Sequence, residues 1–277
     1  MAMETVAETE TPAADLRGNG TGSGTGTGTG SGEAAAGAGG SLSALRELAR
    51  PEDGEILHAL LWVPGPGRRM VSSAVLGGGI GEREWVLNAQ VAHGYRRTDP
   101  DRHLAELARA AGARGAGVGL MTAADVTARG YAADGGAEAV VTSGVSVRGW
   151  AAAPPEDGSQ PQDGAEPHDD ASAPPAPAPG TINIVVSLPV ALSDAALVNA
   201  VLTATEAKVQ ALLDAGYDCS GTPTDAVCVA ARSPRPGAEV HAFAGPRSPW
   251  GSRLARAVYR AVRTATPPAP HGPDTPG

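Results

Sequence analysis

Aromatic residues, cysteines and lysines are scarce in this chain. Its 277 residues include one phenylalanine, four tyrosines and four tryptophans, too few for the aromatic platforms on which nucleic acid bases stack. Cys219 and Cys228 do not suffice for a disulfide framework or a structural zinc site. No apolar run is long enough to cross a membrane, and the acidic N-terminus lacks the apolar core of a signal peptide. We therefore expect a cytoplasmic protein that binds neither nucleic acid nor membrane.

Three stretches have the composition of disordered chain. Residues 1–42 are dominated by a Gly/Thr/Ser tract, residues 151–179 are acidic and rich in Ala and Pro, and residues 267–277 are again rich in Pro. Such segments bury too little apolar surface to offset the entropy of ordering. The first two stretches together have a net charge of −10, whereas the whole chain has −9. The remaining residues therefore have a net charge of +1 and are near neutral. We expect one domain formed by residues 43–150 and 180–266.

The clearest structural pattern is a strand, a helix and a second strand. Residues 181–188 are almost continuously apolar, which predicts a buried strand ended by Pro189. A helix is expected to begin after the capping residue Ser193 and to end at Gly216, and residues 226–230 return to strand character. Weaker patterns predict a helix over 41–50, two strands joined like a hairpin over 56–63 and 69–76, strands over 84–91, 117–121 and 138–146, and helices over 100–111 and 249–263. This alternation predicts an α/β fold, a single layered domain in which helices cover a mixed sheet.

The helix after Ser193 carries the chain's one lysine, Lys208. A 100° step per residue places Lys208 within an apolar face, with Thr205 near its centre, Glu206 at its edge and Thr203 on the opposite side. A lysine in an apolar face is costly unless it is paired, so Lys208 either extends to the rim or belongs to a site with Glu206 or Asp225. The predicted apolar face consists of Leu197, Val198, Val201, Leu202, Val209, Leu212 and Leu213.

Several polar motifs admit two interpretations each. The glycine run 77–81 lacks the Lys-Ser/Thr of a phosphate-binding P-loop, so it is either a ligand-binding turn or a place of close backbone approach. Ser73 is either a nucleophile or an ordinary hydroxyl at a strand end. Asp225, which follows Thr222 and Thr224, either acts as a base or caps a turn. The six histidines are scattered, and we expect no metal site.

Taken together, seven segments resemble the adenosylcobinamide amidohydrolase family. The resemblance covers about residues 56–263 and implies hydrolysis of one amide of adenosylcobinamide, giving adenosylcobyric acid and (R)-1-aminopropan-2-ol, in corrinoid salvage for cobalamin biosynthesis. It implies a corrinoid as the small-molecule partner and no cofactor, because cobalt enters inside the substrate. The segments are VSSAVLGGGIG (71–81), WVLNAQV (85–91), GYRRTDP (94–100), GVGLMTAADV (117–126), GTINIVV (180–186), TATEAKVQAL (203–212) and GTPTDAVCVAA (221–231).

Amide hydrolysis needs an activated nucleophile, an oxyanion donor and a proton for the leaving amine. We assign these roles to residues within the matching segments. Glu206 or Asp225 would activate water, and Lys208 would protonate the amine or orient the carboxylate. Covalent attack would instead use the hydroxyl of Ser73, Thr222 or Thr224. Backbone amides of Gly77, Gly78 and Gly79, or the side chain of Asn183, would bind the oxyanion, and the expected wall residues are Asn88, Gln90, Trp85 and Tyr95.

Two other functions compete with this prediction. A corrinoid-binding protein without catalysis would bind adenosylcobinamide and leave its amide intact. A nucleotide-dependent transferase that uses the glycine run would bind a nucleoside triphosphate. Incubation with adenosylcobinamide separates the first from the enzyme, and a thermal-shift screen with nucleotides separates the second. The sequence does not determine the oligomeric state.

Overall fold

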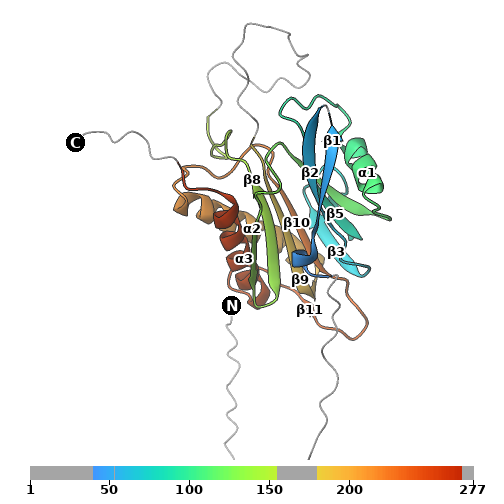
Figure 1. The fold of residues 1–277 in the computed structure, drawn as a ribbon. Coiled ribbons are helices and arrows are strands. Elements are labelled where there is room, and N and C mark those ends of the chain that lie inside the picture. Colours follow the sequence, from blue (N-terminus) through green and yellow to red (C-terminus); the bar gives the residue numbers. More distant parts are fainter. Residues whose placement is uncertain (1–39, 53, 155–179, 270–277) are drawn as a thin grey trace, which may run out of the picture. The chain divides into compact units, whose positions relative to one another are not determined.

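The computed structural model describes residues 40–52, 54–154 and 180–269. These residues form an α/β fold, as predicted, with two mixed β-sheets in place of the one expected (Figure 1). Most of the three segments predicted to be disordered lies outside the described residues. Leu42, at the boundary of the first, is described and buried between the sheets, where it belongs to a short 3-10 helix, Leu42–Ala44.

The smaller sheet has the strand order β1-β2-β5-β6. Its first three strands pair antiparallel and its last two pair parallel. Helix α1 (Pro100–Ala110) connects β5 to β6 and packs against them, as a crossover between parallel strands requires. The bounds of the four strands are Arg46–Glu52, Glu55–Trp62, Trp85–Gln90 and Gly117–Thr122.

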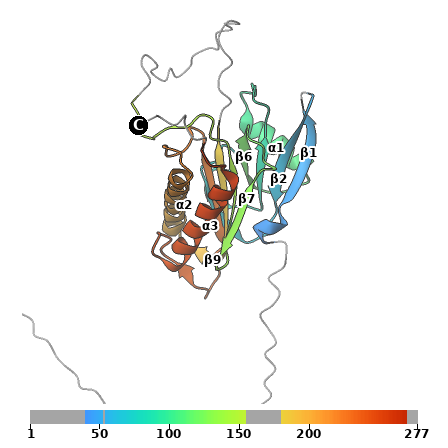
Figure 2. The same ribbon diagram turned by 60° about the vertical axis from the view of Figure 1, so that its left-hand side comes forward.

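The larger sheet has the order β4-β3-β10-β9-β8-β7, with β11 beside the end of β9. Its central pair, β9 and β10, is parallel and is connected by helix α2 (Asp194–Asp214), while α3 (Pro249–Ala265) lies beside α2 on the same outer face (Figure 2). The strand bounds in sequence order are Arg68–Ser72 for β3, Gly79–Glu82 for β4, Gly130–Asp134 for β7, Ala137–Ser143 for β8, Ile182–Leu192 for β9, Ala226–Arg232 for β10 and Val240–His241 for β11.

The two sheets pack face to face, so the order of layers is α2 and α3, larger sheet, smaller sheet, α1. Three apolar cores fill the spaces between these layers. The core between the sheets is built from strand residues of both, among them Trp62, Val118, Val185 and Cys228. This arrangement explains why residues 182–188 are apolar at every position but Asn183 and Ser187: one face of β9 meets the helices and the other meets the smaller sheet.

The predicted helix ends agree with the structure. Ser193 caps α2 by accepting a hydrogen bond from the Ala196 N–H at 3.1 Å, and Ser248 caps α3 in the same way from the Gly251 N–H. Gly216 adopts the left-handed conformation expected just beyond a helix, with φ of 88°. Pro100 occupies the first turn of α1, where a missing N–H costs nothing.

Three predictions about elements were wrong. Residues 46–52 form β1 and not part of a helix, because this segment pairs along its whole length with β2. The strands predicted as a hairpin over 56–63 and 69–76 belong to different sheets, since β2 pairs with β1 and β5 whereas β3 pairs with β10 and β4. β9 continues past Pro189, because the pairing with β10 shifts register there and the missing N–H is tolerated.

The predicted buried face of α2 was confirmed at Leu197 and Leu212 and wrong at other positions. Val198, Leu202 and Leu213 are 50%, 56% and 45% exposed, whereas Thr203, placed on the polar side, is buried and donates to the Ala244 carbonyl at 2.8 Å. Small side chains face the sheet and α3 because two helices and a sheet meet here at close range. The buried face consists of Ala196, Ala200, Ala204, Ala207 and Ala211, flanked by Leu197, Leu212 and Lys208.

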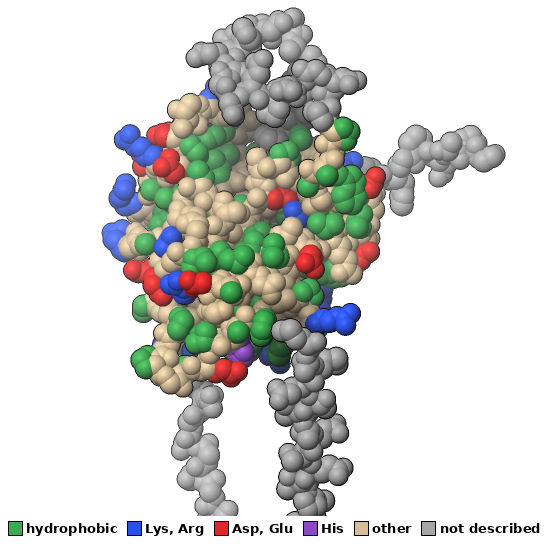
Figure 3. All heavy atoms as spheres, turned by 180° about the vertical axis from the view of Figure 1, so that it is seen from behind, with side chains coloured by type: hydrophobic (Ala, Val, Ile, Leu, Met, Phe, Trp, Pro, Cys, Tyr) green, Lys and Arg blue, Asp and Glu red, His purple; other side chains and the backbone are tan. Residues whose placement is uncertain are grey.

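The surface of the described part carries charges of both signs. On the face seen in Figure 3, acidic and basic side chains lie interspersed with apolar ones. None of the helices in residues 40–52, 54–154 and 180–269 has the length and apolar character needed to cross a membrane.

Candidate functional site

A cavity of about 510 Å³ opens where strand ends of the two sheets meet. β3 and β6 end there, and β9 and β10 begin there. The volume lies within the range of small-molecule sites. Polar side chains from both sheets line it together with apolar ones, namely Ser73, His93, Tyr95, Thr122, Thr181, Thr224 and Asp225.

Asp225 is the most heavily bonded side chain of this cavity. Its Oδ1 accepts from the Ile182 N–H at 2.9 Å and from the Thr222 hydroxyl at 2.6 Å. Its Oδ2 accepts from the Thr222 N–H at 3.2 Å and from Lys208 Nζ at 2.5 Å. A carboxylate has about four acceptor positions, so all of them are in use. Asp225 therefore ties α2, the start of β9 and its own turn together.

Lys208 reaches Asp225 from the edge of the buried face of α2. The side chains of the pair are 9% and 12% exposed, so the lysine does not extend to the rim. Gly221 closes over the pair: a Cβ at this position would lie 2.2 Å from Asp225 Oδ2 and 2.5 Å from Lys208 Nζ, and its φ is +146°. A glycine is thus required for the turn to approach the ion pair. Cys219 is buried nearby, and burial raises the pKa of its thiol.

The hydroxyl groups of the cavity differ in which of their hydrogen-bonding positions are already used. Thr224 Oγ1 donates to the Gly180 carbonyl at 3.2 Å and lies 2.5 Å from Thr181 Oγ1. These two threonines therefore bond to each other and to backbone. Ser73 Oγ accepts from the Val227 N–H at 3.1 Å, which orients the hydroxyl and leaves its proton to be donated. Ser73 is exposed to the cavity.

Asn88 and Asn183 lie together between the sheets, outside the cavity lining. Asn183 Nδ2 donates to Asn88 Oδ1 at 2.8 Å and to the carbonyl of the lining residue Met121 at 3.1 Å, and Asn88 Nδ2 donates to Thr142. Asn183 Oδ1 is buried without a hydrogen-bond partner among the described residues. The two asparagines thus bridge the sheets next to the cavity wall.

The glycine run does not line this cavity. A Cβ on Gly77 would lie 1.9 Å from the Gly117 carbonyl oxygen, and one on Gly78 would lie 2.6 Å from that of Ala74. Leu76 pairs with Gly119 of β6, and Gly79 begins β4. Close approach of backbones is therefore what these glycines permit, the second of the two interpretations.

Gln90 and Trp85 also lie away from the cavity. Gln90 Oε1 accepts from the His58 N–H, and the Gln90 carbonyl accepts from Arg50, so this residue holds β5 to its neighbours. Trp85 lines a separate hollow beside α1, together with Gly77. Tyr95 is the one predicted wall residue that the structure places in the lining.

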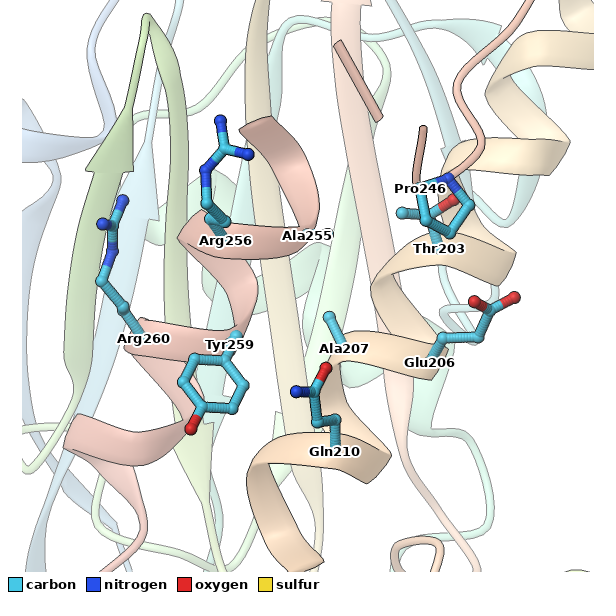
Figure 4. Close-up of a pocket in the computed structure, with 9 residues that line it drawn as sticks. All are labelled: Thr203, Glu206, Ala207, Gln210, Pro246, Ala255, Arg256, Tyr259 and Arg260. Carbon is cyan, nitrogen blue, oxygen red and sulfur yellow. The ribbon is translucent and has the colours of Figure 1, made fainter. Parts of the chain in front are cut away.

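Glu206 lies in a different groove. Its exposed side chain lines a hollow of about 420 Å³ between α2 and α3, together with Gln210, Arg256 and Tyr259 (Figure 4). It is two residues from Lys208 on the helix, about 200° around the axis, so the two side chains leave α2 in different directions. The structure therefore brings Lys208 together with Asp225 and not with Glu206.

Sequence reasoning did not predict a link between Tyr95 and His103. The Tyr95 hydroxyl lies 3.0 Å from Nδ1 of His103, a buried residue of α1, and the two rings are nearly parallel. Burial raises the pKa of Tyr95 and lowers that of His103. The sequence offered one signal for this contact: Tyr95 lies shortly before the predicted helix start at Pro100, and His103 lies shortly after it.

Within residues 40–52, 54–154 and 180–269, no three side chains of His, Cys, Asp or Glu gather closely enough to hold a metal ion.

Comparisons with known proteins agree with one another. The model of a family described as adenosylcobinamide amidohydrolase matches residues 44–268. A protein of Methanosarcina mazei named adenosylcobinamide amidohydrolase is 32% identical over 198 residues, which are 69% of this chain and 86% of that protein. A protein of the same name from Halobacterium salinarum is 43% identical over 88 residues, which are 31% of this chain and 36% of that protein.

Proposed function

Because the chain belongs to the adenosylcobinamide amidohydrolase family, a family of hydrolases, we propose that it hydrolyses the aminopropanol amide of adenosylcobinamide. The products would be adenosylcobyric acid and (R)-1-aminopropan-2-ol, and the reaction would return salvaged corrinoid to cobalamin biosynthesis. The cobalt would enter as part of the substrate.

The observation that carries this proposal is the cavity between the sheet ends. Six of the seven stretches that resemble the family contribute its walls, all except residues 203–212. A cavity of about 510 Å³ suits a small ligand, whereas a corrin ring with its adenosyl group is larger. We therefore infer that the aminopropanol arm enters the cavity and the ring remains outside it.

Ser73 is the hydroxyl best placed to stabilise the oxyanion. The Val227 N–H orients its Oγ, and its proton is available to the carbonyl oxygen of the amide. Loss of one such donor typically lowers kcat by about 10²–10³-fold. We propose attack by water, with Ser73 as oxyanion donor. Covalent attack by the same hydroxyl is the alternative, and the acyl-enzyme that it would form at Ser73 distinguishes it.

Lys208, Asp225 and Thr224 would act by holding the wall in place. Asp225 already accepts four hydrogen bonds, so it has no acceptor position left for a water molecule. Its carboxylate instead fixes the turn that presents Thr224 to the cavity. We therefore regard Asp225 and Lys208 as positioning residues.

The test is incubation of the purified protein with adenosylcobinamide in H₂¹⁸O, with mass spectrometry of both products. We expect one ¹⁸O in the carboxylate of adenosylcobyric acid and a stoichiometric amount of aminopropanol. Ser73→Ala should lower kcat by about 10²-fold, while Ser233→Ala, at the opposite end of β10, should leave it unchanged. Under single-turnover conditions the covalent alternative would also place the label in the product, but it would trap an acyl-enzyme at Ser73. Tight binding without products would show a corrinoid-binding protein and overturn the proposal.

A further inference from the structure

Behind the cavity wall on the side of the smaller sheet lies a buried histidine, His103, and one side chain, Tyr95, separates it from the cavity. Tyr95 lines the cavity from the loop after β5, and its hydroxyl lies 3.0 Å from Nδ1 of His103 in α1. The rings are nearly parallel, at an interplanar angle of 6°. His103 is 6% exposed, so the hydrogen bond to Tyr95 links its imidazole to the cavity.

The other imidazole nitrogen faces a carboxylate. His103 Nε2 lies 3.8 Å from Glu52 Oε1, and Glu52 Oε2 accepts from Arg50 Nε at 2.8 Å. A neutral imidazole has one N–H. If that N–H is on Nε2, it points toward the Glu52 carboxylate, and Nδ1 is the acceptor for the Tyr95 hydroxyl. At 3.8 Å the carboxylate is beyond hydrogen-bond distance, so Glu52 acts on this N–H through its charge.

Amide hydrolysis at this cavity needs a group that takes a proton and later returns it. Asp225, the carboxylate of the opposite wall, has all four acceptor positions occupied. Burial lowers the pKa of His103, so the imidazole is neutral at pH 7 and can accept a proton. The other charged groups that act on it are Arg50 and Glu52 of β1, Arg97 of the preceding loop and Glu106 of α1.

We propose that Tyr95 and His103 form the proton-transfer pair of the amide hydrolysis, with Tyr95 as the catalytic residue that touches water and substrate and His103 as the residue that stores the proton. This inference rests on the proposed function and deepens it. Glu52 is a positioning residue that acts through His103.

The proton returns to the products within one turnover. The oxygen of water forms a bond with the amide carbon while one of its protons passes to Tyr95 Oη and the tyrosine's own proton passes to His103 Nδ1. The carbon–nitrogen bond then breaks and its electron pair stays on nitrogen. The proton on His103 returns through Tyr95 to that nitrogen, so the products are a carboxylic acid and a primary amine, and no other reactant is consumed.

Three variants test the pair. Tyr95→Phe keeps the ring and removes the hydroxyl, and His103→Gln removes the imidazole; each should lower kcat by about 10²-fold or more, because general acid–base groups contribute about 10²–10⁴-fold. The double variant should be no slower than the slower single variant, because the two groups act as a unit. Matched controls are Tyr131→Phe and His241→Gln, whose side chains bond to Glu138 and Trp250 elsewhere in the fold; both should keep wild-type kcat.

The pH profile separates catalysis from a structural role. Activity should fall on the acid side as His103 becomes protonated and Nδ1 ceases to accept. Glu52 raises the pKa of His103, so Glu52→Gln should move this acid limb to lower pH. A purely structural histidine would leave the limb where it is. His93 also lines the cavity, and His93→Gln should not move the limb.

The outcomes distinguish the inference from the proposed function. Wild-type protein that releases no aminopropanol refutes the proposed function itself. Active wild type with an equally active, folded Tyr95→Phe variant refutes the inference alone. So does an acid limb that responds to His93→Gln and not to Glu52→Gln. If His103→Gln fails to fold, Tyr95→Phe and Glu52→Gln still decide between these results.

Discussion

Replacement of Lys208 by methionine tests whether the ion pair at the base of the cavity supports the fold. The change removes the ammonium group and leaves the Asp225 carboxylate with three of its four hydrogen bonds. Both side chains are at most 12% exposed, so water compensates little. Breaking a buried ion pair in this way typically costs about 3–5 kcal/mol of unfolding free energy, and we expect about 3 kcal/mol.

A double-mutant cycle measures the pair itself. Asp225→Asn leaves one amide oxygen that accepts two hydrogen bonds, so two of the four donors lose their acceptor, at about 1–3 kcal/mol each. In the double variant with Lys208→Met, one of those donors is gone. We therefore expect the double variant to be about 1–3 kcal/mol more stable than the sum of the single changes predicts.

Urea unfolding followed by circular dichroism provides the assay. The control is Arg69→Met, which breaks the exposed pair of Arg69 with Asp194 and should cost less than about 1 kcal/mol. Strictly additive single changes, or a Lys208→Met variant no less stable than Arg69→Met, would show that the buried pair does not stabilise the fold.

Three further predictions concern sites around this framework. Gly221→Ala should cost more than about 3 kcal/mol by urea unfolding, because its Cβ would lie 2.2 Å from Asp225 Oδ2 at a φ of +146°, while Gly94→Ala, with open space around it, should cost less than about 1 kcal/mol. Burial raises the pKa of Cys228 to about 12, so iodoacetamide at pH 8 should leave this thiol unmodified in native protein and alkylate it in urea, as peptide mass spectrometry will report. Two arginines of α3 lower the pKa of Asp134 to about 2. The interaction of Asp134 with these arginines therefore stabilises the fold above the unfolded-state pKa and is lost as the pH falls through 2. Asp134→Asn should cost at most about 1 kcal/mol of unfolding free energy at pH 7 and nothing at about pH 1.5.

Local signals in the sequence were sufficient for the helices and the central strands. Ser193, Ser248 and Gly216 mark helix ends by chemistry that acts within a few residues. The apolar run before Pro189 predicted a strand buried on both faces. The partners of each strand depend on contacts far apart in the sequence. For this reason the sequence predicts a hairpin for β2 and β3, although the loop between them passes from one sheet to the other.

The error on α2 has a specific physical cause. Hydrophobic periodicity assigns the largest apolar residues to the core, yet Val198, Leu202 and Leu213 point outward. Where a helix lies against a sheet and a second helix, closeness of approach matters more than the area that each side chain buries, and alanine permits it. Lys208 was placed correctly on the buried side because the two candidate faces share that edge of the helix.

The candidate site likewise contains residues that the sequence indicated and residues whose contacts depend on the tertiary structure. A lysine within an apolar face indicated either a position at the rim or a partner acid, Glu206 or Asp225, and the structure pairs it with Asp225. Glu206 is only two residues from Lys208 and Asp225 is seventeen, yet the turn of α2 sends Glu206 to the other groove. Tyr95 and His103 carry no such local signal, since their contact depends on how the loop after β5 enters α1.

The glycine run connects these observations. Gly77 and Gly78 let the segment after β3 cross from the larger sheet and press against β6, with Gly77 lying close to the Gly117 carbonyl. Ser73, a few residues earlier on this segment, lines the cavity on one side, and Thr122, at the end of β6, lines it on the other. A Cβ at Gly77 would lie 1.9 Å from the Gly117 carbonyl oxygen, so a side chain there would push this segment away from β6. We therefore expect a substitution at Gly77 to act on the site through the spacing of the two cavity walls, because Gly77 itself does not line the cavity.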